Sequence, residues 1–143
     1  MHPVLIPLPL LGRILIAVIF VQAGISQLGA IDATSANMAN HGIPYANVLV
    51  WGAIALGLVG GVMLIVGLLT RLVALALFFY TLTLAVLFHP YWAFTGAAER
   101  TQHAFFFGHL AMMVGMLFIV AFGAGPLSLD ALIFGRGKAR GVG

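Results

Sequence analysis

The chain has 143 residues, of which 63% are hydrophobic and only 6% are charged, whereas soluble domains have roughly 45–50% apolar and about 25% charged residues. This composition excludes a water-soluble globular protein. The formal charge of +3 comes from nine scattered charges, too few for a nucleic-acid-binding surface, and the absence of cysteine excludes disulfides and thiolate metal sites.

Four apolar stretches follow one another along the chain, and each is long enough to cross a bilayer. They cover residues 9–28, 48–69, 72–88 and 104–122. Because a segment that spans lipid must satisfy its own backbone groups, each stretch predicts a helix. Four such runs in so short a chain leave no polar face for a soluble fold. We therefore predict one all-α domain over residues 1–143, an integral membrane four-helix bundle.

The amino terminus indicates a retained first span, because no basic region and no small-residue cleavage site mark a signal peptide. Two short helices are predicted outside the spans. Asp32 can cap one over residues 33–39, which His41-Gly42 would end. Ser128 can cap an interfacial helix over residues 129–134, with Asp130 in its first turn.

Basic residues near the span ends predict the orientation of the bundle. Arg100 lies on one side, and five basic residues lie on the other, namely Arg13, Arg71, Arg136, Lys138 and Arg140. An excess of Lys and Arg marks the cytoplasmic side. We therefore expect both termini in the cytoplasm of a bacterial cell, with the bundle in its inner membrane and the two longer connections facing outwards.

The inner rim holds a buried charge that needs a partner. Arg13 lies well inside the first span, where an unpaired charge costs a few kcal/mol or more, at least about 2.5. Asp130 is the only acid on the same side, so we predict a structural ion pair of Arg13 with Asp130, joined by Arg71. The alternative is an arginine that reaches lipid phosphate. Arg13 also shares one helical face with Ala17, Phe20, Gly24 and Gln27, and this face is expected to point inwards.

The second span contains Gly57 and Gly61 four residues apart, a spacing that lets two helix backbones approach closely. Packing is the interpretation that we prefer for this pair.

The outer rim gathers most of the polar and aromatic side chains. Histidine can bind a metal or haem, hydrogen-bond a quinone carbonyl, or exchange a proton near neutral pH. The alternative to a binding site is a belt of polar and aromatic residues at the membrane interface. No HxxxH or HxxxE spacing indicates a metal site. His109 is the sharper candidate because it lies deeper in a span among phenylalanines and methionines. The predicted cofactor-binding residues are Gln27, His89, Trp92, His103 and His109; no catalytic residue and no metal ligand is assigned.

A family resemblance follows from motifs in a fixed order: Arg13, the Gly24-to-Leu28 turn, Gly42-Ile43-Pro44, Gly60-Gly61, Gly67-to-Arg71, Phe88-to-Trp92 and Ser128-to-Asp130. Over about residues 10–132 the chain resembles the DoxX family of small bacterial membrane proteins. The resemblance implies a four-helix membrane bundle and an association with quinone-linked or thiol-stress oxidoreductase complexes. The chain departs from the family at Gln27, Gly57 and Gly108-His109, where charged or amide residues are usual.

Three functions follow as hypotheses. The first is a quinone-associated redox protein or a subunit of a membrane oxidoreductase complex, with electrons from a membrane or redox partner because the chain shows no flavin or nicotinamide motif. The second is a non-catalytic accessory subunit. The third is a haem- or copper-binding protein that uses the outer histidines. A transporter or channel is disfavoured, since no inverted repeat is visible. The predicted partners are the lipid bilayer and a membrane or redox protein, and a homo-oligomer is compatible with the sequence.

Overall fold

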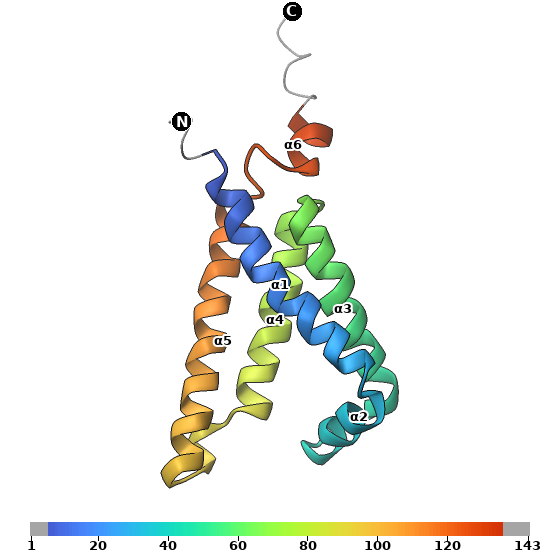
Figure 1. The fold of residues 1–143 in the computed structure, drawn as a ribbon, viewed down its shortest axis with the longest axis vertical. Coiled ribbons are helices and arrows are strands. Elements are labelled where there is room, and N and C mark those ends of the chain that lie inside the picture. The colour runs from blue at the N-terminus through green and yellow to red at the C-terminus, as the bar shows by residue number, and fades with distance from the viewer. Residues whose placement is uncertain (1–5, 136–143) are drawn as a thin grey trace, which may run out of the picture.

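The computed structural model describes residues 6–135, which are helical apart from short turns. Four long helices are accompanied by two short ones, and Figure 1 shows their arrangement. In chain order the elements are α1 (Leu8–Leu28), α2 (Ile31–Asn40), α3 (Ala46–Val66), α4 (Thr70–Phe88), the 3₁₀ turn η2 (Tyr91–Ala93), α5 (Gly96–Phe122) and α6 (Leu129–Phe134). The predicted all-α fold is confirmed for the described part of the chain.

The four long helices are all long and apolar enough to cross a membrane, which confirms the four predicted spans. The largest difference in their bounds is at α5, which begins at Gly96 rather than at residue 104. The first turns of α5 are polar, so hydropathy alone does not include them in the predicted apolar span, although they belong to the same helix. Glu99 lies in the first turn, where a carboxylate interacts favourably with the helix dipole.

The turn between α3 and α4 also differs from the prediction. α3 ends at Val66 rather than at residue 69, because Gly67 and Leu69 adopt left-handed backbone conformations with φ of 73° and 47°. Glycine adopts this conformation readily, whereas leucine does so at a cost. The chain thereby reverses direction within three residues, and α4 begins at Thr70 instead of residue 72.

The two short helices are where the sequence places them, with one correction. Ala30 occupies the N-cap position of α2, so the prediction that Asp32 caps this helix is wrong, and Asp32 lies in the first turn. His41 ends α2 and Gly42 follows with a φ of 78°, as predicted. The predicted cap of α6 is confirmed, because Ser128 Oγ accepts a hydrogen bond of 3.1 Å from the amide of Ala131.

The long helices form two antiparallel pairs, α1 with α3 and α4 with α5 (Figure 1). The two pairs meet at the end of the molecule that carries α6, and they diverge towards the end that carries α2. We call these the α6 end and the α2 end.

Glycines bring α1 and α3 together. A Cβ atom at Gly57 would lie 3.1 Å from the carbonyl oxygen of Phe20, and one at Gly61 would lie 2.6 Å from Cγ2 of Val21. Larger side chains would push the two helices apart. The close backbone approach predicted from the spacing of these glycines is therefore present.

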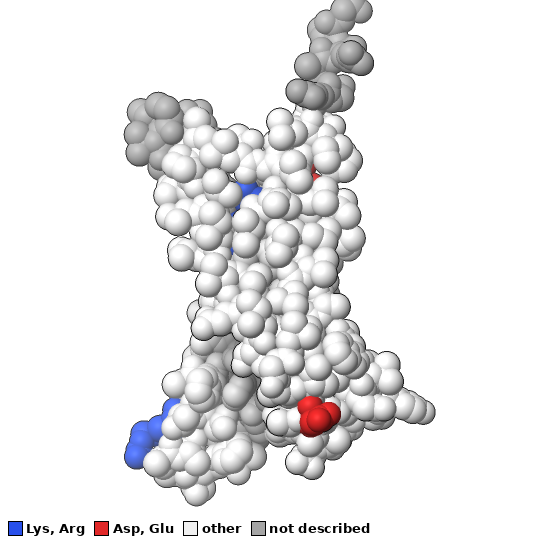
Figure 2. Space-filling view, turned by 45° about the vertical axis from the view of Figure 1, so that its right-hand side comes forward, with Lys and Arg blue, Asp and Glu red and all other residues white. Residues whose placement is uncertain are grey.

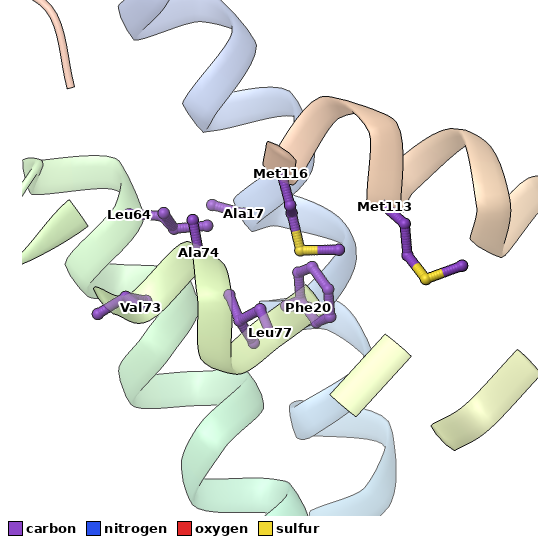
Figure 3. Close-up of a cluster of buried hydrophobic side chains, with 8 residues drawn as sticks. All are labelled: Ala17, Phe20, Leu64, Val73, Ala74, Leu77, Met113 and Met116. Carbon is purple, nitrogen blue, oxygen red and sulfur yellow. The ribbon is translucent and has the colours of Figure 1, made fainter. Parts of the chain in front are cut away.

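The core between the pairs is small and apolar. Ala17 and Phe20 of α1 are buried in it, and Gly24 and Arg13 are buried on the same face, which confirms that this face points inwards. Figure 3 shows how all four long helices contribute side chains. The buried members of this cluster are Ala17, Phe20, Leu64, Val73, Ala74, Leu77, Met113 and Met116.

Charged side chains avoid the middle of the molecule. On the face shown in Figure 2 they lie towards the two ends, and the surface between them is uncharged. Large apolar side chains of every long helix are exposed, among them Leu15, Val59, Phe79 and Phe118. This is the surface expected of a bundle whose middle contacts lipid.

Candidate functional site

Arg13 lies at the α6 end and is 1% exposed. Its Nη1 donates to the carbonyl oxygens of Leu64 and Ile65 at 3.0 and 3.3 Å, and its Nη2 donates to that of Leu127. Leu64 and Ile65 belong to the last turn of α3, where carbonyls have no partner within the helix. Arg13 therefore caps α3 from another helix and ties it to the segment before α6.

Asp130 plays the reciprocal part at the start of α4. Its two carboxylate oxygens accept hydrogen bonds from the amides of Leu69 and Thr70, at 2.8 and 2.9 Å. Its own amide donates to the carbonyl of Gly67 at 2.8 Å. Because the first amides of a helix lack internal partners, the carboxylate acts as a cap supplied from a distant part of the sequence.

The pKa of Asp130 reflects these contacts. Partial burial alone would raise it, but the hydrogen bonds from Thr70 and Leu69 and the nearby charge of Arg13 outweigh burial. The pKa of this carboxyl consequently lies below its usual value, and the group is ionised at neutral pH.

Arg13, Asp130 and Arg71 lie at one end of the bundle, but their arrangement differs from a simple ion pair. The hydrogen bonds of Arg13 and Asp130 go to backbone groups, and the two charges attract each other through space. Arg71 is exposed beside Gly123 and lines a shallow pocket with Asp130. The hydrogen bonds of Arg13 and Asp130 connect α3, the α3–α4 turn and the segment that leads into α6.

A cavity of about 770 Å³ lies at the α2 end, where the helix pairs diverge. Its walls are α3 and α4, α2 covers it, and α1 and α5 each contribute a glutamine. Its lining is mainly apolar and contains no Lys, Arg, Asp or Glu. The lining residues are Gln27, Thr34, Asn37, Met38, His41, Ile43, Leu49, Gly52, Ala53, Leu56, Tyr80, Thr83, Leu84, Leu87, Phe88, His89, Phe94 and Gln102.

Two polar pairs face this cavity. Nδ1 of His89 lies 2.7 Å from Oε1 of Gln102, and Nε2 of Gln27 donates to the hydroxyl of Tyr80 over a longer distance of 3.5 Å. An amide oxygen can only accept, so Nδ1 of neutral His89 carries the proton and Nε2 keeps a lone pair. The cavity thus offers both hydrogen-bond donors and an acceptor.

The predicted site residues lie in three places. Gln27 and His89 line the cavity. His109 lies behind His89, with ring centroids 5.0 Å apart, and its Nδ1 lies 2.7 Å from the carbonyl oxygen of Phe105. Trp92 and His103 are not among the lining residues; both contact Tyr91 in an aromatic cluster next to α5, with centroids 5.2 and 4.9 Å from its ring.

Six polar lining residues were not predicted as site residues, namely Thr34, Asn37, His41, Tyr80, Thr83 and Gln102. Gln102 lies seven residues before His109, so helical periodicity places both on one face of α5 and could have found it. Tyr80 lies inside an apolar span, and only its hydroxyl group could have indicated a site residue. His41 ends α2 and stacks against Phe88 with ring centroids 4.5 Å apart, a contact that no local pattern predicts.

Within residues 6–135, no three His, Asp or Glu side chains gather closely enough to hold a metal ion. His89 and His109 form a pair without a third such ligand. Haem or copper on the histidines stays a prediction that a spectrum can test.

Comparisons with known proteins agree with this architecture. The sequence profile of the DoxX family matches residues 8–90. Two Escherichia coli K12 proteins are similar: inner membrane protein YphA is 30% identical over 90% of both chains, and inner membrane protein YqjF is 31% identical over 87% of this chain and 90% of its own. No solved structure matches. With its four apolar spans, the chain is a multi-pass inner membrane protein that belongs to the DoxX family.

Proposed function

We propose that the cavity at the α2 end binds a quinone-like ring and that the protein serves a membrane oxidoreductase complex as its quinone-binding component. The observation that carries the proposal is an uncharged, mainly apolar cavity of about 770 Å³ with two polar pairs on its lining. Its volume lies in the range of roughly 300–1,000 Å³ that is typical of small-molecule sites. A mainly apolar lining with a few polar groups is also typical of such sites.

The lining matches the chemistry of such a ring. A carbonyl oxygen needs donors, which the amide of Gln102 and the hydroxyl of Tyr80 supply. A ring hydroxyl needs an acceptor, which Nε2 of His89 supplies. A quinone, when bound, would accept two electrons and two protons. Nε2 of His89, which keeps its lone pair, would take up a proton and exchange it with the ring, and the neighbouring His109 is a second imidazole.

The electrons would come from a membrane or redox partner, since the chain itself carries no cysteine and no dinucleotide motif. The excess of basic residues at the α6 end favours an orientation with that end in the cytoplasm. Arg136, Lys138 and Arg140, which contribute to this argument, lie outside the described residues. The cavity would then face the outer leaflet.

Binding can be tested on the purified protein in lipid nanodiscs, by titration with a quinone and detection of the bound fraction. We expect His89→Ala and Gln102→Ala each to weaken binding about tenfold, because each removes a hydrogen bond worth roughly 1–1.5 kcal/mol. His103→Ala is the matched control, because this histidine lies outside the cavity, and it should bind like the wild type.

The same samples decide between the alternatives. A wild-type protein that neither retains quinone through purification nor binds it in the titration refutes the proposal and favours the accessory subunit. An absorption band in the visible region, lost in His89→Ala and His109→Ala, would instead favour haem or copper.

A further inference from the structure

The cavity at the α2 end is not closed to its surroundings, because several of its lining residues are exposed. Three of them lie outside the long helices, namely Asn37, His41 and Phe94. Four lining residues of α3 and α4 are also exposed, namely Leu49, Gly52, Thr83 and Leu87. We call them the α3–α4 opening. They lie in the first two turns of α3 and the last two turns of α4, within segments that are apolar enough to cross the membrane. The opening therefore faces lipid rather than water.

The distance of the opening from the membrane surface follows from helix geometry. Gly52 is six residues from the start of α3, and Thr83 is five residues from the end of α4. At 1.5 Å per residue these positions lie about 7–9 Å inside the helix ends. The opening consequently sits in one leaflet, near its headgroups.

Polar and apolar groups are distributed unevenly over the cavity. The four lining residues of α3 are Leu49, Gly52, Ala53 and Leu56, none of which has a polar side chain. The polar pairs come from α1, α4, α5 and the segment after α4. The hydroxyl of Thr83, the one polar group at the opening, donates to the carbonyl of Phe79 and is already satisfied. An apolar passage thus leads to a polar interior.

The absence of formal charge from the lining narrows the ligand further. A phospholipid phosphate or a fatty-acid carboxylate would enter a mainly apolar space without a cationic partner, and burying such a charge is costly. A neutral ring with carbonyl or hydroxyl groups requires only hydrogen bonds.

We propose that the ligand is a membrane-dissolved molecule with an uncharged polar ring and a long apolar tail, which enters sideways through the α3–α4 opening. The ring lies against Gln27, Tyr80, His89 and Gln102, and the tail stays in the opening and the adjoining leaflet. This inference rests on the proposed function and adds the ligand class and its route.

Gly52 offers a sharp test. It lines the cavity, and a Cβ atom added there would meet nothing within 4 Å, so a larger side chain starts in open space and would narrow the opening. Gly108 on α5 is equally open but outside the cavity. Gly52→Leu and Gly108→Leu therefore make the same chemical change in a helix, with the same gain in helix propensity.

The experiment measures binding of two quinones that share a ring and differ in the tail, each expressed as mole fraction in nanodisc lipid. The wild type should bind both within about threefold of each other, because the tail can remain in lipid. Gly52→Leu should weaken the tailed quinone about fivefold or more and the tailless ring less than about twofold, and Gly108→Leu should change neither. An excess of acidic phospholipid should not displace the tailed quinone.

Each other result overturns the inference. If Gly52→Leu weakens both ligands equally, or neither, the lateral route is wrong while ring binding stands. Displacement by the acidic phospholipid refutes the uncharged ligand class. If the wild type binds neither quinone, the proposed function fails, and the inference falls with it.

Discussion

Single residues at the α6 end show how a membrane bundle uses charge. Arg13 is buried, yet its guanidinium is directed at carbonyls that the end of α3 leaves without partners. Guanidinium is suited to this role because its donors form a rigid planar fork. Gly67 completes the arrangement, since a Cβ atom there would collide with Nη1 of Arg13. A charge that is costly in lipid thus becomes a structural fastening.

Removing this charge should destabilise the protein. Arg13→Met keeps most of the side-chain volume but leaves three carbonyls without their donor, so we expect a loss of about 3 kcal/mol. The stability of Arg13→Lys should lie between that of the wild type and that of Arg13→Met, since an ammonium group cannot reach all three acceptors in the same geometry. Thermal unfolding in detergent, followed by helical ellipticity, measures the effect.

Arg100→Met is the control, because Arg100 is exposed at the α2 end, and its change should stay within about 0.5 kcal/mol. Equal melting temperatures for Arg13→Met and the wild type would show that the hydrogen bonds of Arg13 contribute nothing.

At the scale of elements, Asp130 couples a helix of six residues to a helix of nineteen. Its folded-state pKa is lowered, so its ionised form contributes stability above the usual carboxyl pKa of about 3.9, and this contribution is lost as the pH falls through the folded-state value. In Asp130→Asn the side chain at this position cannot ionise. We expect the wild type to be more stable at neutral pH by about 1 kcal/mol, and the difference to shrink below about pH 4.

Melting temperatures of both proteins between pH 7 and pH 3 measure this difference. A difference that stays constant over the whole range would mean that the charge of Asp130 has no part in holding α6.

The elements also show what a sequence can and cannot predict here. The spans follow from apolar length, and Ser128 and Gly42 mark helix ends by local chemistry, so these predictions are confirmed. The start of α5 could not be read from hydropathy, because its first turns lie beyond the apolar stretch. The choice of which histidines line the cavity depends on how residues 89–95 turn α4 into α5. That turn places His89 against Gln102 while Trp92 and His103 contact Tyr91 in the separate aromatic cluster.

At the scale of the whole molecule, the two ends differ in both packing and charge. The α6 end is closed by Arg13 and Asp130, whereas the α2 end is open between the helix pairs. Arg13 and Arg71 lie at the α6 end and Arg100 at the α2 end, so the positive-inside rule predicts an orientation with the α6 end in the cytoplasm. A cavity at the opposite end would then exchange with the outer leaflet.

The lack of cysteine makes this orientation directly testable. Ala33→Cys marks the α2 end and Gly135→Cys marks the α6 end, and both positions are exposed. In intact spheroplasts a membrane-impermeant maleimide should label Ala33→Cys at once, and it should label Gly135→Cys only after the membrane is permeabilised. The reverse pattern would place the cavity in the cytoplasmic leaflet, and any partner that supplies electrons to it would then have to be sought on that side.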